Sequence, residues 1–551
     1  MIMFVFLFAC TLTSTYGYYP SVTVEEGTLL GTFHTTLNGS QVHAFLGIPY
    51  ASPPVGDYRF KEPQRPKLWT GIREATSVGN QCLQTSFPAN FTEDNHIKTI
   101  GDEDCLYLNV FTPKLASEIN AEADFMNVLV YIHGGGFMFG TGNDVRPDRI
   151  LQIDNIVFVT ISYRLGALGF FAANDSAAPG NNGLKDQVAA LQWIQRNIRK
   201  FGGDPAKVTV YGCSAGGASV NYLMISPTTE GLFQSAISSS GSILTPWSLQ
   251  TENVMNRSKE LVSLLNCRHK RVNTMMECLR NKSVNEIMDH AYRPYFADGY
   301  PMNVRWGAAL EIPHHGAFLS KDPLALLEAG EVKHIPWMIT MSENEGIAMG
   351  YDVVLNRTKM SAINQNWNKM MPNIFSYNNI NSKHERDRIS ASIRKYYFKN
   401  KPLSNQTLGR YFQALTDRQF FNGIIESAKL YSAASLEDTY CYKLYYWELN
   451  AYPMFEKYYG CPHCGDVPYI VKYPFGTTDK DMTRLLTSNI VAFMKNGNPN
   501  NPEVNVEWKP ISENRVMNCL GIYSYTVQKM EDIEDHSTTR FRNNLLPPAI
   551  Y

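Results

Sequence analysis

The sequence lacks an excess of charge of either sign, because its 50 lysine and arginine residues nearly balance its 51 aspartates and glutamates. The basic residues are scattered, so there is no positive stripe to bind a phosphate backbone, and we do not expect nucleic acid as a partner. The sequence also lacks any Pro/Ser-rich linker, repeat or charge block that would divide the chain. With 551 residues and 44% hydrophobic side chains, we expect one large folded domain over 18–551.

Long apolar runs are also missing, since no stretch of about 18 residues beyond the N-terminus is apolar enough to span a bilayer. The first residues, MIMFVFLFACTLTSTYG, form a shorter apolar run followed by small residues, although they lack basic residues. We interpret 1–17 as a signal peptide, with a buried N-terminal strand as the alternative. The C-terminus NNLLPPAIY resembles neither a lipid-anchor signal nor a retention signal, so a soluble, secreted protein is expected.

N-glycosylation sequons support secretion, because the chain has more of them than its composition suggests for a cytosolic protein. They begin at Asn38, Asn90, Asn174, Asn256, Asn281, Asn356 and Asn405.

Ten cysteines include Cys10 in the signal, which leaves an odd number and predicts at least one that is free or paired outside the chain. In an oxidising compartment, Cys82 with Cys105 and Cys267 with Cys278 are natural loop closures. Each is worth about 2 to 4 kcal/mol. Spacing alone does not prove these pairs.

Apolar segments bounded by turn signals predict buried strands at 128–132, 156–162 and 208–212. Between the last two, a stripe of apolar residues at helical spacing ends at Gly202 and predicts a helix. The stripe consists of Val188, Leu191, Ile194 and Ile198. Strand, helix and strand in this order indicate a mainly parallel sheet, whose functional residues gather at the carboxyl ends of its strands.

Ser214 lies in the pentapeptide GCSAG, directly after a predicted strand and before a predicted helix. Glycines on both sides allow the sharp reversal that exposes a nucleophilic serine at the apex of such a turn. A serine that only caps the helix is the alternative. The strand before it and the helix after it favour the nucleophile.

A nucleophilic serine needs amide groups that stabilise the oxyanion, and YIHGGGFMFG supplies glycines at the end of the first predicted strand. Gly134, Gly135 and Gly136 can turn their amides outward, and Ala215 adds another. Phosphate binding is the alternative for this loop, but the Lys-Ser, Lys-Thr and G-x-G-x-x-G patterns are missing.

An acid and a base complete the constellation. The segment HIPWMITMSENEGIAMG ends an apolar strand at Met341 and places Glu343 and Glu345 on a loop, while His463 lies in YYGCPHCGDVPYIV. Each residue alone is typical of a surface charge or a structural histidine. The order serine, acid, histidine is that of α/β-hydrolases, in which the acid orients the base.

Several blocks of the chain resemble the type-B carboxylesterase and cholinesterase family of α/β-hydrolases. They are FGGDPAKVTVYGCSAGG, EDCLYLNVFTP, FLGIPYASPPVGDYRFKEPQ, YRLGALGFF, PGNNGLKDQ and SSSGS. The resemblance implies an α/β-hydrolase fold, with a large, mostly parallel central sheet flanked by helices, and a serine esterase that acts on a small-molecule carboxylic ester without metal or organic cofactor.

The resemblance also implies roles for individual residues. Ser214 is the nucleophile, Glu345 the acid, because it precedes the glycine of the acidic loop, and His463 the base. Gly135, Gly136 and Ala215 form the oxyanion hole, and Ser240 supports the acid. The implied disulfides are Cys82 with Cys105 and Cys267 with Cys278.

Two departures from the family pattern involve cysteine. Cys213 stands where many members have Glu or Gln, so a carboxylate that favours cationic ligands is missing. Cys464 follows His463 in place of the usual glycine. A Cys461–Cys464 disulfide is our leading interpretation; pairing with Cys441 or Cys519, free buried thiols and, least favoured, zinc are the alternatives.

The third departure concerns the substrate. In cholinesterases the first disulfide loop carries a tryptophan that binds quaternary ammonium, whereas here that loop contains Phe87 and Phe91 but no Trp. An uncharged or weakly charged ester is therefore expected, with Trp247 as an acyl-pocket wall or as ordinary core. The alternatives are a cholinesterase, and a silent binding protein resembling neuroligins and glutactin.

Overall fold

The computed structural model describes residues 19–85, 97–297, 305–355, 357–448, 459–472, 479–511 and 516–533. The predicted signal peptide, two sequon asparagines and both phenylalanines of the first disulfide loop lie outside the described residues. These four positions are Asn90, Asn356, Phe87 and Phe91.

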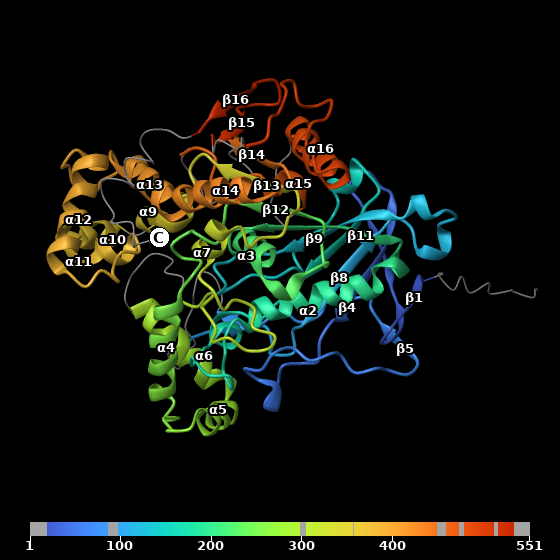
Figure 1. Ribbon diagram of the computed structural model, residues 1–551, viewed down its shortest axis with the longest axis horizontal. Coiled ribbons are helices and arrows are strands. Elements are labelled where there is room, and N and C mark those ends of the chain that lie inside the picture. The colour runs from blue at the N-terminus through green and yellow to red at the C-terminus, as the bar shows by residue number, and fades with distance from the viewer. Residues whose placement is uncertain are drawn as a thin grey trace, which may run out of the picture.

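An eleven-stranded sheet crosses the molecule (Figure 1). From one edge to the other its strands are β16 (Gln528–Asp532), β15 (Asn518–Ile522), β14 (Thr439–Leu444), β13 (Trp337–Ser342), β12 (Ser235–Ser239), β11 (Gly203–Cys213), β9 (Met126–Ile132), β10 (Val157–Ile161), β8 (Tyr107–Thr112), β4 (Gln41–Pro49) and β3 (Thr32–Thr35). The neighbours from β15 to β10 pair in parallel, and antiparallel strands close both edges. The predicted parallel sheet is confirmed for its centre.

The three predicted strands are β9, β10 and β11, each buried on both faces of the sheet. Along β9, Val128 and Val130 belong to the core on one face, whereas Leu129 and Tyr131 belong to the core on the other. Burial on both sides explains why these strands read as continuous apolar runs rather than alternating ones.

Helices cover both faces of the sheet. α2 (Asn182–Asn197) and α3 (Ala215–Ile225) contribute to the first core, and α16 (Lys480–Asn496) contributes to the second. The predicted helix is α2, which continues into a 3-10 turn and ends at Gly202, with φ of 78°. This positive φ is the reason that a glycine ends the helix.

Further helices form two groups at one end of the sheet, on the left of Figure 1. The lower group holds α4 (Thr251–Leu264), α5 (Val272–Arg280) and α6 (Val284–Ala297). The upper group has its own apolar core and holds α8 (Ile347–Gly350), α9 (Asp352–Leu355), α10 (Arg357–Gln365), α11 (Trp367–Ile374), α12 (Lys383–Phe398) and α13 (Leu408–Thr416). A π-helical turn over Asp417–Phe421 connects α13 to α14 (Asn422–Ala434).

The remaining elements are short. They are the helices α1 (Gly166–Phe170), α7 (Pro323–Ala329) and α15 (Val467–Ile470), the small sheet of β1 (Ser21–Val24), β2 (Gly27–Leu30) and β5 (Ile72–Glu74), and the pair β6 (Gln84–Thr85) and β7 (Thr99–Ile100). The central strands are parallel, so their carboxyl ends lie on the same side of the sheet. The predicted site residues follow these ends of β9, β11, β12, β13 and β14.

Candidate active site

Ser214 lies at a sharp turn between β11 and α3. Its φ of 61° and ψ of −122° are rare for a residue with a side chain. A β-carbon on Gly212 would collide with the backbone of Gly216, and a β-carbon on Gly216 would collide with the carbonyl group of Ile132. Close packing therefore requires both glycines, and the turn holds the half-buried Ser214 at the carboxyl edge of the sheet.

The glycine-rich loop after β9 packs directly against Ser214. A β-carbon on Gly134 would lie 2.9 Å from the Ser214 β-carbon. Gly135 and Gly136 have φ of 106° and 60°, which disfavour any other residue. The loop thus packs against Ser214 through Gly134, and Ala215, the first residue of α3, follows Ser214 directly.

Glu345 contacts His463 in the interior. The fully buried Glu345 carboxylate places Oε2 2.5 Å from Nδ1 of His463. Its other oxygen, Oε1, accepts hydrogen bonds of 2.7 Å from the Ser240 hydroxyl and 2.7 Å from the Ser342 amide. These three donors fix the carboxylate, and Ser240 contacts it as the resemblance implies.

Glu343, the other glutamate of this loop, points elsewhere. Its Oε2 accepts a hydrogen bond of 3.3 Å from the backbone N–H of Cys461. The structure therefore brings Glu345, rather than Glu343, to the histidine.

A disulfide joins Cys213, directly before Ser214, to Cys464, directly after His463. The predicted Cys461–Cys464 disulfide is therefore wrong. The backbone N–H of Asn344 donates a hydrogen bond of 2.8 Å to the Cys461 carbonyl. The Cys461 thiol is buried and forms no disulfide. Cys464 lies instead against the end of β11, which spacing within the CPHC motif does not reveal.

The other described disulfides are Cys82–Cys105, Cys267–Cys278 and Cys441–Cys519. The last of these links the neighbouring strands β14 and β15. Burial raises the pKa of the Cys461 thiol well above its usual value, so this thiol is protonated and unreactive at neutral pH.

One group of side chains has the spacing of metal ligands: the sulfurs of Cys213 and Cys464 and a ring nitrogen of His463 lie within 4.8 Å of one another. The two sulfurs are bonded to each other, however, and a disulfide is not the thiolate pair that zinc prefers. The donor set therefore does not fit a zinc ion.

Phe420 packs against the histidine, although no sequence pattern marks it. It lies on the π-helical turn, with its ring centroid 4.7 Å from that of His463. Trp247 packs behind it at 6.0 Å between centroids and donates its indole N–H to the Gln419 carbonyl. Trp247 is thus buried, and it backs the aromatic ring that lines the histidine.

Asp466 is a second buried carboxylate, on the histidine loop itself, and no sequence pattern marks it. It accepts hydrogen bonds from the hydroxyls of Ser239 (2.8 Å), Thr340 (2.6 Å) and Tyr442 (2.7 Å). These donors lie on β12, β13 and β14, so Asp466 ties the loop to three neighbouring strands.

His133, at the start of the glycine-rich loop, stays neutral. Its burial lowers its pKa to about 4. Nδ1 donates to the Gly134 carbonyl at 2.8 Å, and the ring stacks on Tyr163 at 4.3 Å between centroids. The imidazole therefore supports the loop without adding a charge near Ser214.

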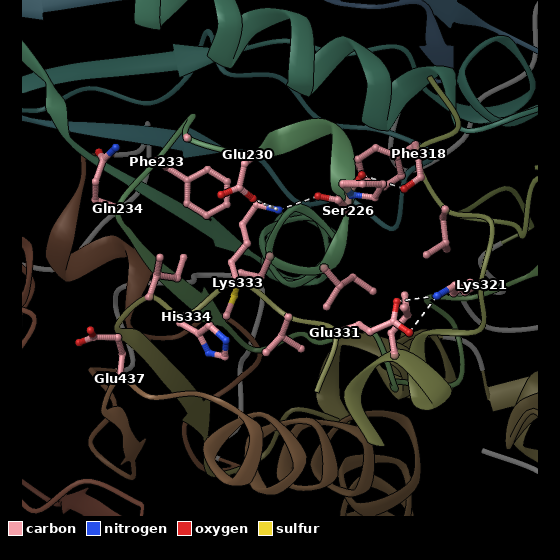
Figure 2. Close-up of a pocket in the computed structure, with 18 of the residues that line it drawn as sticks. Ser226, Glu230, Phe233, Gln234, Phe318, Lys321, Glu331, Lys333, His334 and Glu437 are labelled. Atoms are coloured by element: carbon pink, nitrogen blue, oxygen red, sulfur yellow. Dashed lines mark hydrogen bonds and ion pairs between the residues drawn. The ribbon is translucent and has the colours of Figure 1, made fainter. Parts of the chain in front are cut away.

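A cavity of about 840 Å³ lies at the other end of α3 (Figure 2). Ser226 and Phe318 line it, and the Lys333 ammonium group donates a hydrogen bond of 2.6 Å to the Ser226 carbonyl. None of the predicted site residues lines this cavity. Because α3 has eleven residues, about 16 Å of helix separate the cavity from Ser214.

The described sequon asparagines are all exposed. They are Asn38, Asn174, Asn256, Asn281 and Asn405. Among the described residues, no helix has the length and apolar character needed to cross a membrane.

Comparisons with known proteins agree with this architecture. The family model described as the carboxylesterase family matches residues 19–539. Esterase FE4 of Myzus persicae is 37% identical over 98% of this chain and 95% of its own length. Neuroligin-2 of Mus musculus is 29% identical over 83% of this chain and 58% of its own length.

A solved structure is also similar: juvenile hormone esterase of Manduca sexta with OTFP covalently attached. It has a TM-score of 0.82 and 26% identity over 96% of this chain and 99% of that chain. The strand order, the flanking helices and these matches agree, and the chain belongs to the carboxylesterase family, as a carboxylic ester hydrolase with an α/β-hydrolase fold.

Proposed function

We propose that this protein is a secreted serine carboxylesterase with Ser214 as nucleophile, His463 as general base and Glu345 as acid. The observation that carries the proposal is the 2.5 Å contact between Glu345 Oε2 and His463 Nδ1. Because Nδ1 faces the carboxylate, Nε2 is the nitrogen that serves Ser214.

In the first half of the reaction, His463 takes the proton of Ser214 as its oxygen attacks the ester carbonyl carbon. Glu345 stabilises the imidazolium that forms. The C–O bond to the alcohol then breaks, the alcohol leaves with the proton from His463, and an acyl-enzyme forms.

In the second half, His463 takes a proton from water, which attacks the acyl carbon, and Ser214 recovers its proton as the carboxylic acid leaves. Both steps pass through an oxyanion. The amides of Gly135, Gly136 and Ala215 are the donors proposed to stabilise it, because the glycine-rich loop packs against Ser214.

A neutral ester suits this site better than a choline ester. The residue before Ser214 is half of an uncharged disulfide, where many family members carry Glu or Gln. Phe420, which packs on the histidine with Trp247 behind it, keeps the surroundings of the imidazole apolar. Apolar surroundings with few polar groups favour an uncharged ester over a cationic one.

Secretion is supported by four disulfides and by the five exposed sequon asparagines among the described residues. Disulfides of this number persist in oxidising compartments and are rare in the cytosol.

Steady-state hydrolysis of 4-nitrophenyl acetate and of acetylthiocholine by the purified protein tests the proposal. We expect a higher kcat/KM for the neutral aryl ester. Ser214→Ala should lower kcat by about 10⁴-fold or more at unchanged fold.

The match to neuroligin-2 supplies the rival outcome. A folded protein that turns over neither ester would contradict the enzyme mechanism and favour a binding protein. Faster turnover of acetylthiocholine would contradict the proposed substrate class alone.

A further inference from the structure

The Cys213–Cys464 disulfide connects the two chain segments that carry the proposed nucleophile and base. Cys213 ends β11 and precedes Ser214, and Cys464 follows His463. The other disulfides among the described residues are Cys82–Cys105, Cys267–Cys278 and the link between β14 and β15, and none of them involves a residue next to Ser214 or His463. This bridge is therefore the covalent link that can fix Ser214 and His463 relative to each other.

The bridge also contacts the acid. The backbone N–H of Cys464 donates to the Ser240 hydroxyl at 3.2 Å, and that hydroxyl donates to Glu345 at 2.7 Å. The sulfurs and a His463 ring nitrogen lie within 4.8 Å of one another. A displacement of Cys464 would thus move His463 and disturb the hydrogen bond that orients its acid.

The histidine loop has little regular structure of its own to hold it. Only the four-residue α15 follows the histidine in the described range 459–472, and Cys464 has a positive φ of 56°. Two anchors follow the imidazole within three residues: the disulfide at Cys464, and Asp466 with its three hydroxyl donors. Asp466 ties the loop to β12–β14, whereas the disulfide ties it covalently to β11 and hence to Ser214.

We propose that Cys213 and Cys464 are positioning residues, whose disulfide sets the distance between the serine and histidine and makes turnover depend on its oxidation. This inference rests on the proposed triad. Reacting groups must be held to within about 1 Å, and a misplacement of that size costs about 10²-fold in rate. An intact bridge supplies this restraint without a charge next to the ester.

The Cys213→Ala/Cys464→Ala double variant tests the proposal, with Cys441→Ala/Cys519→Ala as its matched control. Both variants remove one disulfide between segments that are distant in the sequence, but only the first disulfide adjoins the proposed triad. We expect kcat to fall by about 10- to 100-fold in the first variant, with KM within about threefold, and kcat to stay within about twofold in the control.

The rate of labelling by a fluorophosphonate, which needs Ser214 and its base but no bound substrate, should fall in parallel with kcat. A folded Cys213→Ala/Cys464→Ala variant that labels and turns over like the wild type would overturn the inference alone. If the wild-type protein takes up no probe, that result contradicts both the proposed function and this inference.

Dithiothreitol gives a second measurement if the double variant does not fold. Its two thiols pass two electrons and two protons to the bridge, which leaves two cysteine thiols and the cyclic disulfide of the reagent. Activity is measured first, and an aliquot is then alkylated and digested to locate the free thiols. Activity should fall as the Cys213 and Cys464 thiols appear, and it should return on reoxidation. Full activity with this bridge reduced would overturn the proposal.

Discussion

Glu345 and Asp466 are two buried carboxylates, the first facing the histidine loop and the second on it, and their partners differ. Glu345 faces the imidazole of His463, whereas Asp466 accepts hydrogen bonds from three hydroxyl groups. A carboxylate against an imidazole stabilises the cation that forms during proton transfer. A carboxylate held by neutral hydroxyls can only fix the chain that carries it. The partner of a buried acid, rather than its burial, therefore indicates its role.

Two adjacent serines bind different members of this pair of carboxylates. The Ser239 hydroxyl donates to Asp466 at 2.8 Å, and the Ser240 hydroxyl donates to Glu345 at 2.7 Å. The chain turns at Ser240, where φ is 53°, so consecutive side chains reach different carboxylates. This dipeptide makes the comparison testable with matched substitutions.

Glu345→Gln should have the largest effect, a loss of kcat of about 10³- to 10⁴-fold. Glutamine keeps the shape but loses the charge that stabilises the imidazolium, and it no longer enforces the required tautomer. Steady-state kinetics measure the loss, and circular dichroism checks that the fold is retained. A loss of less than tenfold would show that Glu345 is not the triad acid.

Asp466→Asn should act on stability instead. The substitution replaces charge-assisted hydrogen bonds to three hydroxyls by weaker ones, at a cost of about 1 to 3 kcal/mol in the free energy of unfolding. We expect a lower urea midpoint and a kcat within about threefold of wild type. A kcat loss as large as that of Glu345→Gln would break the comparison.

Ser240→Ala and Ser239→Ala test the comparison between Glu345 and Asp466 further. Ser240→Ala removes a donor to the proposed acid and an acceptor for Cys464, so kcat should fall by about tenfold. Ser239→Ala should leave kcat unchanged and lower the free energy of unfolding by about 1 kcal/mol. Equal kinetic effects of the two substitutions would contradict the separation of roles.

Tyr442→Phe should have the smallest effect, and the effect depends on pH. Burial, and then Asp466, raise the pKa of Tyr442 well above its usual 10.0. Above pH 10 the unfolded phenol loses its proton while the folded phenol keeps it, so this stabilisation is complete below pH 10 and falls as the pH rises.

The variant should therefore be about 1 kcal/mol less stable than wild type near pH 8, with a gap that narrows above pH 10. Urea unfolding at several pH values measures the gap. A constant gap up to about pH 11 would show that Tyr442 does not titrate differently in the two states.

Local patterns predicted the central part of the fold. The apolar runs of β9, β10 and β11 and the stripe of α2 depend on neighbours a few residues away, and each formed as expected. The turn at Ser214 was predictable for the same reason, because its flanking glycines lie within two residues.

Several contacts between distant segments were not predictable from local patterns. The CPHC spacing favoured a bridge within the motif, but Cys464 bonds to Cys213, 251 residues away. Asp466 is a carboxylate near a histidine, and only the arrangement of β12, β13 and β14 shows that it binds hydroxyls. Phe420 reaches His463 because a π-helical turn presents it, and no sequence pattern marks that turn.

The intact mass of the purified protein after treatment with a fluorophosphonate tests the central claim most directly. Such a probe modifies a serine that a base activates beside an oxyanion hole. The account predicts one adduct on the wild-type protein, located at Ser214 and missing from Ser214→Ala. No adduct on the folded protein, or one on another serine, would contradict it.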